Sequence, residues 1–370
     1  MRFEDIHVTG VGAELGLAVA TSAMVRRGAV STADARRTRQ RSVCVSEDSG
    51  PELAVSAARE AVSGHERMTG QPPVIGAHLH AQMFDKPDFW SAACYVLDQL
   101  GVTGCGVTCE IGAMSNGAVL GVEIGASLLS ARRDLDTALI TVGDRFTGNR
   151  FARYRADYGV QYGDAGAALM LGRDPGLARV VSAATCTDPV LEGLTRGTPP
   201  TTVTGSHRSG TSGADGVVTS RSTADGGVID VLARQRVWLR EHGGLGEALR
   251  RNRAGVRKAT RVALADAGIS LEDARWILLP FLGYEAVRAR WYRPLGIGEE
   301  RATDTLTMLG LHLGHLGAAD HVVGLRHLIS TGSVSPGDFV VLASSGAGMT
   351  WTTVVLQIAD HASRGVARSP

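Results

Sequence analysis

Short apolar runs alternate with longer amphipathic segments along the first half of the chain. Apolar runs bounded by turn residues favour buried strands, whereas apolar residues that recur every three or four positions favour helices. Residues 4–15 are predicted to form a strand and a loop, further strands are predicted at 72–82, 137–146 and 164–174, and another short apolar run begins at 107. The predicted helices cover residues 50–64, 89–101 and 116–132. This alternation is typical of an α/β layer structure.

The second half of the chain repeats the same theme. Its predicted strands cover residues 177–185, 274–281, 338–346 and 350–359. Its predicted helices cover residues 251–269, about 283–295 and about 317–330. We therefore expect two similar α/β halves, residues 1–174 and 175–370, that press together.

One segment between these elements has a different composition. Residues 196–227 are rich in Gly, Ser, Thr and Pro and contain few apolar residues, which predicts a long flexible loop. A loop of this length inside a compact protein is either a functional cover or simply mobile. Residues 228–251 then look helical, and we expect that this segment could lie over an active-site entrance.

Length, charge and hydropathy exclude several classes of protein. The 370 residues are 44% hydrophobic and 20% charged, which suffices for a large core. The net charge is +1, and the basic clusters at 35–41 and 250–253 are separated by neutral sequence, so we expect no nucleic-acid partner. The first residues do not resemble a cleavable leader, and no apolar run reaches the roughly 18 residues of a membrane span. We expect a cytoplasmic protein without a membrane partner.

The cysteines and one glycine-rich stretch do not predict a metal or a redox cofactor. Five cysteines in a chain of this length predict reduced, mostly buried thiols. Cys105 and Cys109 lie four residues apart, but no second Cys or His pair stands near them at ligand spacing, so buried strand cysteines are expected there. "GVGAELG" at 10–16 resembles a dinucleotide-binding loop, but its spacing is wrong and no acidic ribose ligand follows.

The stretch "VTCEIGAMSNGAVLGVEIGA" at 107–126 places a small polar residue between a strand and a helix. The apolar run stops just before Ser115, and the long helix opens just after it. A strand, a tight turn and a helix in this order present one side chain at the helix start. Ser115 is therefore a candidate nucleophile, although serine at a helix start is also a common N-cap.

Three motifs, in order along the chain, resemble those of the thiolase-fold ketosynthase III family. "CEIGAMSNGAVLGVEIGASLL" is similar to the family's nucleophile segment, with Glu110 at its acidic position, Gly117 at its glycine and Ser115 at its catalytic cysteine. "YGDAGAALML" at 162–171 and "SSGAGMTWTTVVL" at 344–356 resemble its strand turn and its C-terminal glycine loop. The resemblance implies a five-layer αβαβα architecture, a homodimer and acyl thioester substrates.

Two further family positions differ in this sequence. The family's Pro-His-Gln-Ala-Asn segment carries a histidine that stabilises an enolate, and here Pro280 is followed by Phe281. The family's partner asparagine matches His315 in "LHLGHLGAAD" at 311–320. A cysteine at a helix start forms a thiolate with little help, whereas a serine needs an adjacent base. The resemblance thus predicts a Ser115/His315 dyad.

The alternative for His315 is a structural histidine in a Gly-rich turn. If His315 is the base, we expect its pKa near 6.5 unless burial lowers it.

These features together predict an acyltransferase. An acyl group would move from a coenzyme A or acyl-carrier-protein thioester to Ser115 and then to an acceptor hydroxyl, amine or thiol, in bacterial natural-product biosynthesis as the resemblance implies. The resemblance places the oxyanion hole at the backbone amides of Ser115 and Gly348. No tightly bound cofactor and no metal are expected. The alternatives are a starter-unit 3-oxoacyl synthase that forms carbon–carbon bonds and a degenerate, non-catalytic partner subunit.

Four residues are predicted to line the substrate pocket. Phe281 and Asp320 belong to the two segments that differ from the family, and His78 and His80 lie at the end of a buried strand. Strand ends converge on ligand sites in α/β folds, although core histidines are the commoner outcome.

Overall fold

The computed structural model describes residues 1–84, 89–147, 151–196 and 229–360. The predicted flexible loop at 196–227 lies outside the described residues except for Arg196, which ends a helix.

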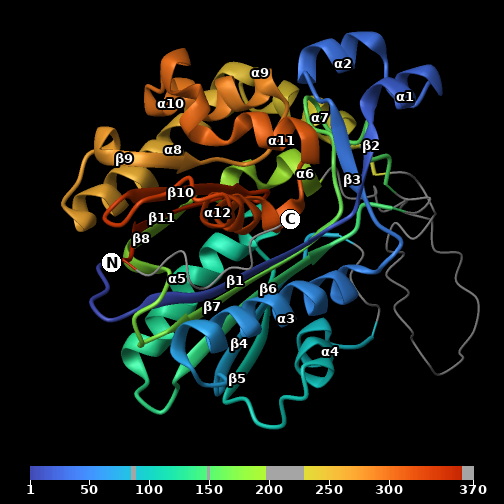
Figure 1. Ribbon diagram of the computed structural model, residues 1–370. Helices are drawn as coiled ribbons and strands as arrows, with labels where there is room; N and C mark the ends of the chain where they lie inside the picture. The colour runs from blue at the N-terminus through green and yellow to red at the C-terminus, as the bar shows by residue number, and fades with distance from the viewer. Residues whose placement is uncertain (85–88, 148–150, 197–228, 361–370) are drawn as a thin grey trace, which may run out of the picture.

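Nine strands form the framework of the fold, in the order β5-β4-β6-β7-β1-β8-β11-β10-β9. A short pairing of His7 with Arg179 and Val8 with Ala178 joins β1 to β8, and the sheet divides there into two layers (Figure 1). The strands are β1 (His7–Leu15), β4 (Ile75–Ala81), β5 (Val107–Ile111), β6 (Thr137–Asp144), β7 (Ala165–Gly172), β8 (Ala178–Thr187), β9 (Ala274–Leu278), β10 (Phe339–Gly346) and β11 (Thr350–Ile358).

The two layers share one pairing pattern. In the first, β1 is antiparallel to β7, β7 is antiparallel to β6, and β6 is parallel to β4. In the second, β8 is antiparallel to β11, β11 is antiparallel to β10, and β10 is parallel to β9. The α/β class and its two similar halves are therefore confirmed. The predicted boundary at 174/175 falls between β7 and β8, and the division into domains stays a prediction.

Helices fill the space between the sheets and cover their outer faces (Figure 1). The central helix α5 (Gly117–Ala131) contacts β4 and β6 on one side and β8, β10 and β11 on the other, and α12 (Asp320–Ser330) lies beside it. The outer helices are α3 (Gly50–Thr69) and α4 (Ala92–Gln99) on the first sheet and α8 (Gly244–Ala267) on the second. A helix buried between two sheets must be apolar on nearly all sides, which explains the single charge in "GAVLGVEIGASLLSA".

The glycines at 10–16 have a packing role in this fold. Gly10 and Gly12 lie in the middle of β1, directly under α3. A Cβ atom at either position would lie 2.1 Å from a carbonyl oxygen, that of Ala61 or of Ala57. The helix can approach the sheet this closely only because both residues lack a side chain.

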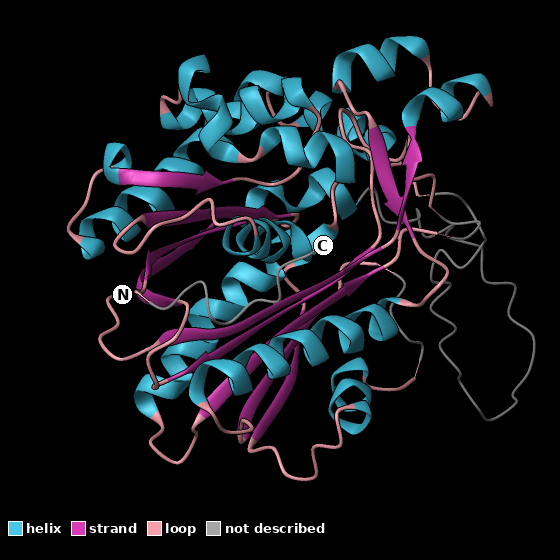
Figure 2. Cartoon of the chain, in the orientation of Figure 1, coloured by secondary structure: helices cyan, strands magenta, loops and turns pink. Residues whose placement is uncertain are grey.

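Several short elements were not predicted from the sequence (Figure 2). Strands β2 (Leu17–Ala20) and β3 (Ser42–Val45) form a separate pair. The unpredicted helices are α1 (Thr21–Arg26), α2 (Thr32–Thr38), α6 (Gly193–Arg196) and α11 (Thr307–Leu313). The helix predicted near 283–295 consists of α9 (Tyr284–Val287), a π-helical turn (Arg288–Tyr292) and α10 (Arg293–Leu295). None of the described helices is both long and apolar enough to span a bilayer.

The prediction of mostly buried cysteines is wrong. All five thiols are free, but only Cys44 is fully buried. Cys109 is exposed because β5 forms the end of the sheet and pairs with β4 alone among the described strands. Cys94, on α4 of the outer layer, is also exposed.

Candidate active site

Ser115 lies in the tight turn between β5 and α5. A single 3₁₀ turn, Met114–Asn116, connects the two elements, as the strand–turn–helix pattern predicted. Met114 has a positive φ of 51°, a left-handed conformation that costs a residue with a side chain about 1–2 kcal/mol. Asn116 ties the turn to β11, since its amide donates to the hydroxyls of Thr350 and Thr352 at 3.2 and 2.8 Å. The turn presents the half-buried Ser115 hydroxyl to the interior of the molecule.

His315 reaches the same place from the other half of the chain. It lies between α11 and α12, and hydrogen bonds hold both its backbone N–H and its carbonyl. Its N–H donates to the Gln161 carbonyl at 2.8 Å, and its carbonyl accepts from the Gly163 N–H at 2.9 Å. Gly314, with φ of 82°, lets the chain turn sharply as it leaves α11.

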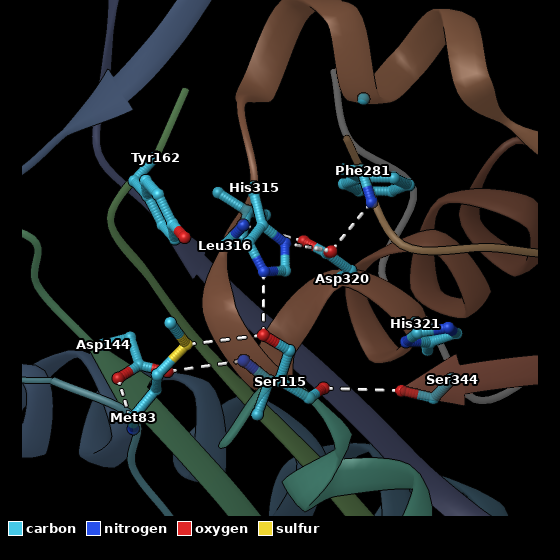
Figure 3. Close-up of polar contacts among 12 residues, drawn as sticks. Met83, Ser115, Asp144, Tyr162, Phe281, His315, Leu316, Asp320, His321 and Ser344 are labelled. Carbon is cyan, nitrogen blue, oxygen red and sulfur yellow. Dashed lines mark hydrogen bonds and ion pairs between the residues drawn. The ribbon is translucent and has the colours of Figure 1, made fainter. Parts of the chain in front are cut away.

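Ser115, His315 and Asp320 form a continuous hydrogen-bonded row (Figure 3). Ser115 Oγ lies 2.8 Å from His315 Nε2, and His315 Nδ1 lies 2.6 Å from Asp320 Oδ2. The Asp320 carboxylate is fully buried and also accepts from two backbone N–H groups, those of Leu316 at 2.7 Å and Phe281 at 2.8 Å. A carboxylate offers only acceptors, so Nδ1 is the donor and Nε2 is left to accept the serine proton.

The charge of Asp320 alters the acid–base behaviour of His315. Burial alone would lower the pKa of this imidazole, because the charged form loses its hydration. The charge and the hydrogen bond of Asp320, together with the charges of Asp144 and Asp157, outweigh burial and raise the pKa above 6.5. The expectation of an unshifted or lowered pKa is therefore wrong.

A second buried carboxylate, Asp144, supports the same region. It stands at the end of β6 and accepts from the N–H groups of Met83 at 2.7 Å, Phe84 at 2.9 Å and Ala318 at 3.3 Å. Burial raises its pKa to about 6, although these three donors oppose the shift. Met83 in turn places its sulfur 3.3 Å from Ser115 Oγ. Sequence reasoning missed Asp144, although an acidic residue at the carboxyl end of a buried strand was a usable signal.

Ser115 and His315 open into a cavity of about 300 Å³. Its walls are mostly apolar and combine residues from both halves. Helix α7 (Val231–Glu241) lines part of the cavity, which confirms that residues 228–251 are largely helical; their place over an entrance stays a prediction. The apolar lining comprises Met83, Phe84, Met114, Phe151, Val160, Leu191, Leu194, Ile229, Val231, Leu239, Leu245, Ala248, Leu249, Pro280, Leu282, Ala347 and Met349.

Phe281 and Asp320, both predicted pocket residues, do not contribute to the walls of this cavity. The Phe281 ring is buried against Gly310 in the core, while its neighbours Pro280 and Leu282 face the cavity. Asp320 is fully buried and contacts His315 Nδ1, whereas Ser115 contacts the other ring nitrogen, Nε2. The site instead uses the backbone N–H of Phe281, which holds Asp320.

His78 and His80 also lie away from the cavity, because of the alternation along β4. Alternate residues of a strand point to opposite faces. Ala81 faces α5, where it lies next to Gly117, so the two histidines face the opposite, outer layer. Both imidazoles contact the hydroxyl of Thr141 at 2.8 Å, and burial lowers the pKa of His78 to about 3. They are core histidines.

Gly348 lies in the loop between β10 and β11, beside the cavity residues Ala347 and Met349. Its φ of 110° is open only to glycine. The role of the Ser115 and Gly348 amides as an oxyanion hole stays a prediction.

Known proteins resemble this chain in part of its sequence and in nearly all of its fold. Residues 264–358 match the family model described as 3-oxoacyl-[acyl-carrier-protein (ACP)] synthase III C terminal. The β-ketoacyl-[acyl-carrier-protein] synthase III of Chelativorans sp. (strain BNC1) is 35% identical over 91 residues, which are 25% of this chain and 27% of the relative. The enzyme of the same name from Dinoroseobacter shibae is 32% identical over 95 residues, 26% of this chain and 28% of its own. The chain thus aligns with little more than a quarter of the length of these relatives.

Solved structures match over nearly the full length. The structure of ChlB3, described as an "aceyltransferase", has a TM-score of 0.83 and 26% identity, and the match covers 98% of this chain and 100% of that one. The 3-oxoacyl-(acyl carrier protein) synthase III from Pseudomonas aeruginosa PAO1 has a TM-score of 0.72 and 19% identity, over 96% of this chain and 99% of that one, and it supports the fold alone. The chain therefore has the thiolase fold of ketosynthase III-like enzymes, and the similarity in sequence to their family model lies in residues 264–358.

Proposed function

We propose that the protein is an acyltransferase that carries its acyl group on Ser115. The donor is a coenzyme A or acyl-carrier-protein thioester, and the acceptor is a hydroxyl, amine or thiol of a bacterial natural-product pathway. The main support is the hydrogen-bonded row in which Ser115 Oγ lies 2.8 Å from His315 Nε2 and His315 Nδ1 lies 2.6 Å from Asp320 Oδ2. The likeness to ChlB3 gives independent support for acyl transfer.

In the proposed reaction each residue of the row has a defined step. His315 Nε2 takes the proton of Ser115 Oγ while Oγ bonds to the thioester carbonyl carbon, and Asp320 stabilises the imidazolium that forms. The carbon–sulfur bond then breaks, and the thiol leaves with the proton from His315. An acceptor gives its own proton to His315, attacks the acyl carbon and releases Ser115 Oγ, which regains that proton. The amides of Ser115 and Gly348 would stabilise the oxyanion in both halves of the reaction.

A carbon–carbon condensing 3-oxoacyl synthase is the runner-up, because the family model and the sequence relatives carry that name. Such an enzyme must stabilise an enolate with polar groups. Phe281 offers only a backbone N–H, and that N–H already donates to Asp320. A degenerate partner subunit is disfavoured by a complete hydrogen-bonded row that such a subunit would have no reason to keep.

A homodimer is also part of the proposal. Strand β5 ends the sheet with one edge unpaired in the part of the chain that the structure describes. The neighbouring side chains of Phe89 and Trp90 are 101% and 53% exposed. An open edge beside large exposed aromatic rings is a typical association surface.

Incubation with a panel of acyl thioesters is expected to add one acyl group to Ser115. Intact mass spectrometry measures the adduct, and peptide mapping locates it. Cys94 and Cys109 are exposed thiols that thioesters can acylate without an enzyme, so the control protein carries Cys94→Ser and Cys109→Ser together. A label that disappears from this control, or that maps to a cysteine in the parent, would contradict the proposal.

Decarboxylation of a malonyl thioester is expected to be slow compared with acyl transfer. The apolar ring of Phe281 cannot hydrogen-bond a developing enolate oxygen. The measurement compares carbon dioxide release with the appearance of the Ser115 adduct in the same sample. Equal rates would favour the condensing synthase.

A further inference from the structure

Two arginines line the mostly apolar cavity, and they differ in how their donors are used. Arg234, on α7, donates from Nη1 to the carbonyl of Thr195 at 2.8 Å. Arg290, in the π-helical turn, makes no side-chain hydrogen bond or ion pair with any residue that the structure describes. A guanidinium has five N–H donors and keeps its charge in proteins. A guanidinium whose donors are unpaired beside apolar walls costs folding free energy unless a ligand or water accepts its hydrogen bonds.

The backbone at Arg290 is held in place from several sides. Its carbonyl accepts from the side-chain amide of the buried Asn252 at 2.9 Å, and Asn252 Oδ1 accepts from the Trp351 indole at 3.2 Å. The following residues, Trp291 and Tyr292, are buried. Single π-helical turns inside α-helices often occur at functional sites. The turn thus fixes the point from which the guanidinium extends.

Arg290 lines the same cavity as Ser115 and His315. The Tyr162 ring stands 5.4 Å from the His315 ring, and the charge of Arg290 is close enough to favour ionisation of the Tyr162 phenol, against the larger effect of burial. Asp157 also lines this cavity, but its Oδ1 already accepts from the Tyr158 N–H at 2.6 Å and from the Gln235 side-chain amide at 3.0 Å. Arg290 is therefore a cation of this cavity, near Tyr162, whose donors are not used by any described residue.

We propose that Arg290 binds a carboxylate at the far end of the acyl group, so that the preferred donors are monothioesters of dicarboxylic acids. This inference rests on the proposed acyl transfer to Ser115. The planar guanidinium can hold a carboxylate through two parallel N–H···O bonds, and the surrounding apolar walls would suit the methylene chain. The carboxylate is retained and transferred intact with the acyl group.

A matched pair of thioesters tests this specificity. Glutaryl and pentanoyl thioesters have chains of equal length and differ in the terminal carboxylate. The parent protein is expected to acylate with the glutaryl thioester about 10- to 100-fold more efficiently, the range for a charge-assisted hydrogen bond. Arg290→Met should remove this preference and keep acylation by the pentanoyl thioester, and Arg290→Lys should retain part of it. Arg288→Met is the control, because Arg288 pairs with Glu299 at 2.7 Å. The inference would be overturned if the parent used both thioesters equally, or if Arg288→Met lost the preference for the glutaryl thioester as fully as Arg290→Met does.

Binding separates this inference from the proposed chemistry. The Ser115→Ala protein is titrated calorimetrically with glutarate monoamide and with pentanamide, neither of which can acylate it. Tighter binding of the glutarate compound that Arg290→Met abolishes supports the carboxylate site even if no thioester acylates Ser115. Equal binding of the two compounds refutes it even if acyl transfer is found.

Discussion

The His315→Asn protein should acquire its acyl group about 10²- to 10⁴-fold more slowly than the parent, the usual contribution of a positioned base. An asparagine side chain cannot take up the Ser115 proton, because its amide is not basic. The same base should appear in the pH profile of the parent. Since the neutral imidazole is the active form and its pKa is raised, the acylation rate should increase with pH around a midpoint above 6.5. Single-turnover intact-mass measurements across pH give both quantities.

The double variant Ser115→Cys with His315→Asn is the informative comparison. A thiol depends less on a base than a hydroxyl does, so the cysteine should recover much of the lost acylation. The Ser115→Ala protein gives the background level of acylation in this measurement. If His315→Asn acylates at the parent rate while Ser115 is present, His315 is not the base. His78 and His80 are poor replacements, since both face the outer layer of the fold.

Replacing Asp320 with Asn should lower acylation by about 10²- to 10⁴-fold as well, because the buried carboxylate fixes the His315 tautomer and stabilises the imidazolium. The pH dependence distinguishes this role from simple damage. Without the Asp320 charge, burial of His315 is less opposed and the pKa falls. A base with a lower pKa is neutral at lower pH, so the midpoint of the acylation profile should move to lower pH.

The surface substitution Asp134→Asn is the matched control, since Asp134 is exposed and pairs with the nearby, exposed Arg132. It should leave both the rate and the midpoint unchanged. An Asp320→Asn protein that is slower but keeps the parent midpoint would assign Asp320 a purely structural role.

Local sequence patterns predicted the setting of Ser115 well. The strand, turn and helix around Ser115 follow from a short apolar run, small residues at the turn and a long apolar helix. Asp320 was expected to line the pocket, whereas it is buried and contacts His315 Nδ1. Its five-residue separation from His315 matches no regular side-chain spacing, and the contact depends on the irregular turn through Gly317, which has φ of 63°.

Other site features lie beyond side-chain reasoning on a single sequence. Phe281 contributes through its backbone N–H, which every residue except proline carries. His78 and His80 were assigned to the cavity because the strand end points there, but the face of a strand depends on register, and one residue of shift exchanges the two faces. Helices α1 and α2 are too short to give a clear periodic pattern.

The hydrogen-bonded row is divided between the two halves of the chain, since Ser115 and His315 are 200 positions apart in the sequence. The first half contributes β1 and β4 to β7 and the second contributes β8 to β11, yet neither half contains both Ser115 and His315. Acylation therefore reports on the docking of the halves in a way that circular dichroism cannot. During refolding, the circular dichroism signal of secondary structure should return before the capacity to form the acyl adduct. The delay between these two signals measures how long the two halves take to pack together.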